Sequence, residues 1–179
     1  MKTIVTVFLF CRMATAQDMQ SCPMHKQHQA EVEKHGDEAM GFSHDKTTHH
    51  FHLSPDGGTI EVISNDSKDA KDLQAIRSHL MHIVTMFTNG DFSIPMFVHS
   101  QIPPGSTEMR EKRNEISYLF EELPDGGRVR ITTKDHDALN AVHDFLRFQI
   151  EDHDTGDKTS NSSLCTDPQC DLDIMTTCP

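Results

Sequence analysis

The chain has 179 residues, with 28 acidic against 16 basic side chains and a formal net charge of −12 at pH 7. This excess of negative charge argues against nucleic acid and anionic membranes as partners, and it favours the attraction of cations. Hydrophobic residues make up only 35% of the chain, which predicts one modest core with polar extensions.

The first sixteen residues have the features of a secretory signal peptide. Lys2 is followed by an apolar run over residues 4–11 and then by the small residues Ala14 and Ala16, a pattern that signal peptidase cleaves. No later stretch approaches the ~20 apolar residues that a membrane helix needs. The sequence therefore predicts a signal peptide over 1–16 and a secreted or periplasmic protein without a membrane span.

Residues 17–46 are polar and rich in histidine and methionine, a composition that predicts a flexible arm. Cys22, Met24 and His25 place a thiol, a thioether and an imidazole within four residues of this arm. The Cys-Pro-Met-His segment resembles short heavy-metal-binding segments of bacterial copper and silver export proteins, and the resemblance implies these three residues as metal ligands. The alternative is a solvated tail in which Cys22 forms a disulfide.

Four cysteines remain after signal cleavage. In an oxidising compartment an even number favours disulfides, and three pairings are open. The cysteines are Cys22, Cys165, Cys170 and Cys178. The last three lie in residues 158–179, which are rich in Ser, Thr and Asp and predict a polar tail.

A sequence repeat defines a core domain over residues 47–157. FHLSPDGGTIEVISND at 51–66 returns as FEELPDGGRVRITTKD at 120–135. Asp-Gly between extended, alternating residues is a strong hairpin signal, and a turn at Asp56-Gly57 places Leu53 opposite Ile60.

An amphipathic helix follows each hairpin. One apolar stripe runs from Leu73 to Phe87 and the other from Leu139 to Ile150, with Asp66, Asp135 and Asp137 as candidate caps. Two β-β-α units predict an α+β fold, in which a four-stranded antiparallel sheet carries the two main helices on one face. The apolar connector at 92–118 is expected to dock on the core and to form a short helix capped by Thr107.

The first helix carries His79 and His82 one turn apart, with Met86 on the same flank. The repeat aligns these histidines with Phe145 and Phe148, which predicts a partly buried location. Such a pair needs partners, and metal ligation is one way to supply them. Hydrogen bonds to backbone or carboxylates beside the core are the alternative.

The connector supplies Met96, His99 and Met109 beside this helix. Thioether with imidazole suits copper, especially Cu(I), better than zinc, calcium or magnesium, and zinc is the alternative ion. Core filling is the alternative for Met96 and Met109. The sequence thus predicts a central site of His79, His82, Met96 and His99, with Met86 or Met109 as further ligands.

Two stretches, PMFVHSQIPPG at 95–105 and FLRFQIEDHDTGD at 145–157, resemble small exported bacterial proteins of unsettled function. Some of these proteins carry the automatic label aspartate carbamoyltransferase. A carbamoyltransferase needs a Ser-Thr-Arg-Thr phosphate loop and a much longer chain, and neither is present.

These observations predict a secreted or periplasmic copper-binding protein used for sequestration, delivery or tolerance, with a metal-delivery protein as a partner. Because histidine binds metal only when neutral, affinity is expected to fall as the pH drops through roughly 6–7. Two other functions stay open: a metal-dependent enzyme with an open coordination position, and a protein-interaction module without catalysis.

Overall fold

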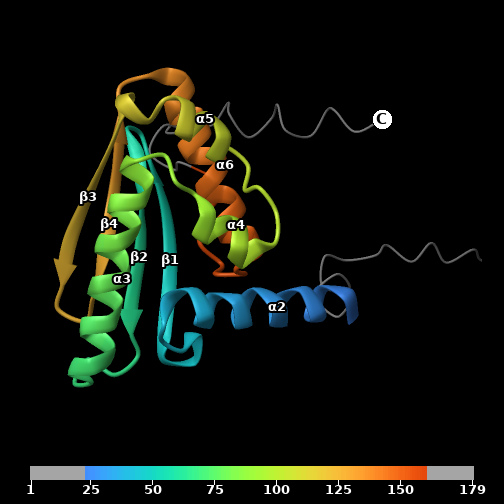
Figure 1. Ribbon diagram of the computed structural model, residues 1–179, viewed down its shortest axis with the longest axis vertical. Coiled ribbons are helices and arrows are strands. Elements are labelled where there is room, and N and C mark those ends of the chain that lie inside the picture. The colour runs from blue at the N-terminus through green and yellow to red at the C-terminus, as the bar shows by residue number, and fades with distance from the viewer. Residues whose placement is uncertain (1–22, 161–179) are drawn as a thin grey trace, which may run out of the picture.

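The computed structural model describes residues 23–160 as a four-stranded antiparallel sheet with helices α3 and α6 on one face (Figure 1). The strands are ordered β1-β2-β4-β3 and span β1 Thr47–Ser54, β2 Gly57–Ser64, β3 Ile116–Leu123 and β4 Gly126–Thr133. The helices are α2 Pro23–Met40, α3 Ala70–Thr88, α4 Ser93–His99, α5 Ser106–Glu111 and α6 His136–Asp152. The predicted α+β fold, built from two β-β-α units, is confirmed.

Several predictions fall on parts of the chain outside residues 23–160. These are the signal peptide, the disulfides and residues 161–179 of the tail, with Cys22, Cys165, Cys170 and Cys178. Within the described residues, no helix combines the length and the apolar character needed to cross a membrane.

Both hairpins form, but their turns lie one residue earlier than predicted. Phe51 pairs with Ile60 and Leu53 with Gly58, so the first turn consists of Pro55 and Asp56. The predicted pairing of Leu53 with Ile60 is therefore wrong by two residues. Because side chains alternate with a period of two, this shift leaves each residue on its predicted face.

The glycines that suggested the turn belong to the strands for a steric reason. A Cβ atom at Gly57, where φ is +147°, would lie 2.1 Å from the carbonyl oxygen of Ile131. At Gly126 a Cβ atom would lie 2.0 Å from the carbonyl oxygen of Val62. The absence of side chains at these two positions lets β2 and β4 pair at the centre of the sheet.

The helices connect the two repeats across the sheet. Helix α3 of the first repeat packs mainly on β3 and β4, while α6 of the second packs mainly on β1 and β2. Their buried stripes include Leu80 and Phe87 on α3 and Phe145 and Leu146 on α6. Burying each such side chain stabilises the fold by about 1.5–3 kcal/mol. The packing of each helix on strands of the other repeat therefore forms much of the hydrophobic core.

Each main helix is preceded by an aspartate that caps it by accepting backbone hydrogen bonds. Asp135 caps α6 by accepting from Ala138 N at 2.8 Å, as predicted. Asp69 caps α3 by accepting from Lys71 N and Asp72 N. The predicted cap Asp66 is wrong, because its carboxylate accepts from Lys68 N in the preceding turn.

Substitution of Asp135 by Ala is expected to lower the free energy of unfolding by about 1 kcal/mol, since the cap bond to Ala138 N is lost. Urea unfolding monitored by circular dichroism measures this change. Asp137→Ala is the control, because Asp137 is exposed and shares Lys112 with Asp135 without capping the helix. Equal losses in both variants would contradict the assignment of the cap.

The connector docks on the core, as predicted, but it forms two helices. Helix α4 covers residues 93–99, and the N-cap of α5 is Gly105, with φ of +75°, rather than the predicted Thr107. A Cβ atom at Gly105 would lie 2.0 Å from the carbonyl oxygen of Ala141. Glycine therefore allows α5 to approach α6 closely.

The predicted flexible arm is wrong for residues 23–40, which form helix α2. The helix buries Val32 and Gly36 and packs mainly against α4. His35 of α2 and Phe97 of α4 pack with ring centroids 4.9 Å apart. Figure 1 shows α2 running crosswise to the strands. Two buried residues and a ring contact in an otherwise polar sequence are a weak signal, which explains why the composition suggested disorder.

Candidate metal centre

The structure separates the four residues predicted as the central site. His79 and His99 line one cavity between the sheet and the helices, whereas His82 is exposed on α3. Met96 is 40% exposed and lines a different hollow, next to Arg110. Because the connector folds as helix α4, His99 turns inward while Met96 faces solvent. The four side chains are not gathered around one point.

The remaining predicted ligands also lie apart from one another. Met86 and Met109 belong to the hydrophobic core, and Met109 is 0% exposed. Core filling was the alternative for Met109, and Met86 fills space in the same way. Met24 and His25 lie in the first turn of α2, where Met24 is 80% exposed.

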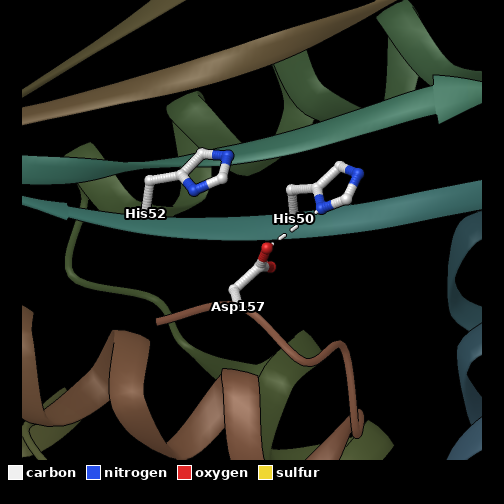
Figure 2. Close-up of side chains that lie close together, drawn as sticks. All are labelled: His50, His52 and Asp157. Atoms are coloured by element: carbon white, nitrogen blue, oxygen red, sulfur yellow. Dashed lines mark hydrogen bonds and ion pairs between the residues drawn. The ribbon is translucent and has the colours of Figure 1, made fainter. Parts of the chain in front are cut away.

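A different group of side chains has the geometry of a metal site. His50, His52 and Asp157 offer ligand atoms that all lie within 4.8 Å of one another, and they form the only such group of His, Cys, Asp or Glu side chains among residues 23–160. Figure 2 shows the two imidazoles on strand β1 and the carboxylate reaching them from the segment after α6. We call this group the histidine–aspartate triad.

Strand alternation places both imidazoles on the face of the sheet that the helices leave open. Phe51 is buried toward α6, so its neighbours His50 and His52 point to the opposite face. The two imidazole rings stack with their centroids 5.8 Å apart and an interplanar angle of 12°. A spacing of two residues on an edge strand therefore brings two imidazoles side by side.

Asp157 is brought to this edge by the turn that ends α6. The chain reverses through Asp154 and Gly156, both with positive φ, and returns to β1. Asp157 Oδ2 accepts from Phe51 N at 2.9 Å, which satisfies an N–H group on the free edge of the sheet. The other oxygen, Oδ1, lies 3.1 Å from His50 Nδ1 and faces the histidines.

The surroundings of Asp157 favour the ionised carboxylate. Burial raises its pKa, but hydrogen bonds from Phe51 N, Thr155 Oγ1 and His50 outweigh this effect, so the pKa of Asp157 is lowered overall. A negative charge that is held in place at neutral pH is the form that a metal ion requires.

The second repeat lacks this chemistry at the matching positions. Under the repeat alignment, His50 corresponds to Leu119, which is 59% exposed, and His52 corresponds to Glu121. Asp157 corresponds to Asp91, whose carboxylate instead accepts from Ser93 N at the start of α4. The triad is thus an addition to one repeat rather than a requirement of the duplicated fold.

Two imidazoles and one carboxylate can bind a transition-metal ion and leave one or more coordination positions for water or an exogenous ligand. Ligands bound to zinc lie about 2.0–2.2 Å from the ion, so the group needs to contract by only about an ångström. The side chain of His52 is exposed, so no packed core opposes such a movement.

Sequence reasoning missed the triad although one signal was present. The alternation His50-Phe51-His52 in a predicted strand places two imidazoles on one face, opposite a core phenylalanine. The carboxylate had no local signal, because Asp157 is 107 residues from His50 along the chain.

Comparisons of the chain with protein-family models, with curated proteins and with solved structures found no match.

Proposed function

We propose that the protein binds one divalent transition-metal ion, Cu(II) or Zn(II), through His50, His52 and Asp157. The observation that carries this proposal is the convergence of the three side chains, whose ligand atoms lie within 4.8 Å of one another. The formal net charge of −12 adds a general attraction for cations.

The donor set bears on the choice of metal. Imidazole and carboxylate suit Cu(II) and Zn(II), whereas Cu(I) prefers sulfur. The triad contains no thioether, and Met96 lines a separate hollow. Copper therefore stays our first proposal in its divalent state, and zinc is the second.

The proposed role is sequestration or delivery of the metal in a secreted or periplasmic setting. The signal-peptide pattern of residues 1–16 supports export. The open position of the triad supports transfer, since a partner protein can approach an edge strand directly. A metal-delivery protein is accordingly the proposed partner.

A metal-dependent enzyme is the second candidate, because three protein ligands leave a coordination position open. Binding without catalysis is preferred on the location of the triad. His52 is exposed, and the histidine-lined cavity lies on the other face of β1 and includes none of the three ligands. Turnover of a redox or hydrolytic substrate by the metal-loaded protein, abolished by His52→Gln, would favour the enzyme.

The binding test is a calorimetric titration of metal-free protein with Cu(II) and with Zn(II) at neutral pH. The expected result is one tight site per chain. For Cu(II), electron paramagnetic resonance is expected to show nitrogen hyperfine coupling. Replacing His50 by Leu, its counterpart in the second repeat, together with His52→Gln should lower the affinity by at least about 100-fold, because two of three ligands are removed.

A matched variant controls for the many other histidines of the chain. His25→Gln with His82→Gln also removes two imidazoles, and neither residue belongs to the triad. This variant should keep the tight site. The proposal fails if both double variants lose the same affinity, or if the unmodified protein binds only weakly and at many sites.

A further inference from the structure

Glu61 is a largely buried carboxylate directly across the sheet from His50. In the pairing of β1 with β2, Glu61 lies opposite His50 and between Ile60 and Val62, both of which are buried toward the helices. Because side chains alternate along a strand, Glu61 projects from the open face of the sheet, which also carries the triad. Side chains directly opposite each other on neighbouring strands have Cβ atoms about 4.5–5.5 Å apart, so the Glu61 carboxylate and the His50 imidazole are neighbours.

The Glu61 carboxylate lacks a strong partner of its own within residues 23–160. Its side chain is only 16% exposed, and its ion pair with Arg128 Nε has an N–O distance of 3.8 Å, which is too long for a hydrogen bond. Arg128 Nε lies closer to Glu121, at 3.2 Å, and it has no hydrogen-bond partner in the part of the chain that the structure describes. Since a carboxylate removed from water needs donors around it, Glu61 has the capacity to accept a hydrogen bond.

The geometry of the triad leaves one nitrogen of His50 for such an acceptor. Asp157 Oδ1 lies 3.1 Å from His50 Nδ1, so Nδ1 is the nitrogen that faces the carboxylate and would share an ion with it (Figure 2). The other nitrogen, Nε2, then carries the proton of the neutral imidazole. Metal-bound histidines almost always donate this second N–H to a carboxylate, a backbone carbonyl or water, which fixes the orientation of the ring and raises its basicity. Glu61 is the carboxylate opposite His50 on the same face.

The second repeat replaces both members of this pair together. Under the repeat alignment, His50 and Glu61 correspond to Leu119 and Arg130, which lie opposite each other in β3 and β4. Arg130 has a structural role of its own, because its guanidinium donates to the carbonyl oxygen of Gly58 at 3.0 Å. The imidazole and the carboxylate thus occur together in the repeat that carries the triad and are absent together from the other, as expected of two groups that act as one unit.

We propose that Glu61 is a positioning residue of the metal site, which accepts a hydrogen bond from His50 Nε2–H when the ion is bound and holds Nδ1 toward the ion. Glu61 is not itself a ligand, since it does not belong to the group whose ligand atoms lie within 4.8 Å of one another. In turning to His50 it gives up only its long contact with Arg128, which keeps Glu121. This inference rests on the proposed metal-binding function and deepens it.

Calorimetric titration of the full chain with Cu(II) and with Zn(II) measures the effect of Glu61→Ala. We expect an affinity about 10- to 100-fold lower than that of the unmodified protein, the loss typical when a partner of a metal-bound histidine is removed. Glu121→Ala is the matched control, because it removes the other carboxylate beside Arg128 and changes the net charge equally, and it should keep the affinity. Glu61→Gln retains an acceptor oxygen without the charge, should give a smaller loss, and provides the test if Glu61→Ala does not fold.

Imidazole nitrogen chemical shifts of the Zn(II)-loaded protein distinguish positioning of His50 from a general effect on stability. We expect His50 to bind through Nδ1 and to carry an Nε2 proton that exchanges slowly with water, both in the unmodified protein and in Glu121→Ala. Glu61→Ala should make this exchange faster. Ligation through Nε2, or a Glu61→Ala variant that matches Glu121→Ala in affinity and exchange, overturns this inference and leaves the metal site intact. Absence of a tight site in the unmodified protein overturns the proposed function and this inference with it.

Discussion

Asp157→Asn is expected to weaken metal binding by at least about 10- to 100-fold, the loss known for removal of even an outer partner of a metal ligand. The amide keeps an oxygen that can accept from Phe51 N, so the contact with β1 survives while the negative charge is removed. The fold should therefore be retained while the affinity is lost. Calorimetric titration and thermal unfolding, performed on the same sample, measure both quantities.

Asp157→Ala separates the two roles of this residue. It removes the charge and also the hydrogen bonds from Phe51 N and Thr155 Oγ1, so we expect the same loss of affinity with an additional destabilisation of about 1–2 kcal/mol. Asp91→Asn, at the matching position of the first repeat, is the control and should leave the affinity unchanged. Unchanged affinity in both Asp157 variants would exclude Asp157 as a ligand.

Acidification is expected to destabilise the protein by a few kcal/mol between about pH 6.5 and pH 4. In the fold, burial lowers the pKa of His79 to about 4 and that of His153 to about 3, from an ordinary value of 6.5. The unfolded chain therefore binds these protons at a higher pH than the folded chain. Each of these histidines therefore lowers the free energy of unfolding by up to about 1.4 kcal/mol per pH unit as the pH falls from 6.5 towards 4. Chemical denaturation at a series of pH values measures the slope.

Asp152 extends the loss of stability to lower pH. Burial raises its pKa, but hydrogen bonds and charge interactions with His99 and His28 outweigh this effect and lower the pKa overall. Its contribution is therefore present above its ordinary pKa of 3.8 and is lost as the pH falls through its folded value.

His79→Phe tests the origin of this acid sensitivity. The change introduces the residue found at the matching position of the second repeat, Phe145. It should reduce the dependence of the free energy of unfolding on pH, above pH 4, by the amount that one bound proton contributes. The exposed His82 serves as the control, since His82→Gln removes an imidazole that solvent already reaches. A slope that His79→Phe leaves unchanged would show that His79 is not a source of the acid sensitivity.

Local sequence patterns were sufficient for the elements of the core. Alternation beside Asp56-Gly57 predicted a hairpin, and the apolar stripe from Leu73 to Phe87 predicted the helix that follows it. The repeat then predicted the same elements a second time. The register was missed because Gly57 is required for the close approach of β2 to β4, which is a contact between the two repeats.

For the candidate site, in contrast, local sequence patterns predicted little and tertiary packing determined which residues meet. The abundance of histidine predicted metal chemistry, but the predicted ligands His82 and Met96 lie on surfaces that only the packing of α3 and α4 determines. Helix α2 likewise depends on its contact with α4, a partner about 60 residues away that its own polar sequence does not specify.

By itself the sequence determined the four strands and the two main helices of the core and which face of each is apolar, because these properties depend on neighbours a few residues apart. It also determined that His50 and His52 share a face of β1. Only the tertiary structure decided that Asp157 completes the group, since the turn after α6 returns the chain to the free edge of β1. A carboxylate 107 residues away reaches an imidazole through packing, and packing has no local signature.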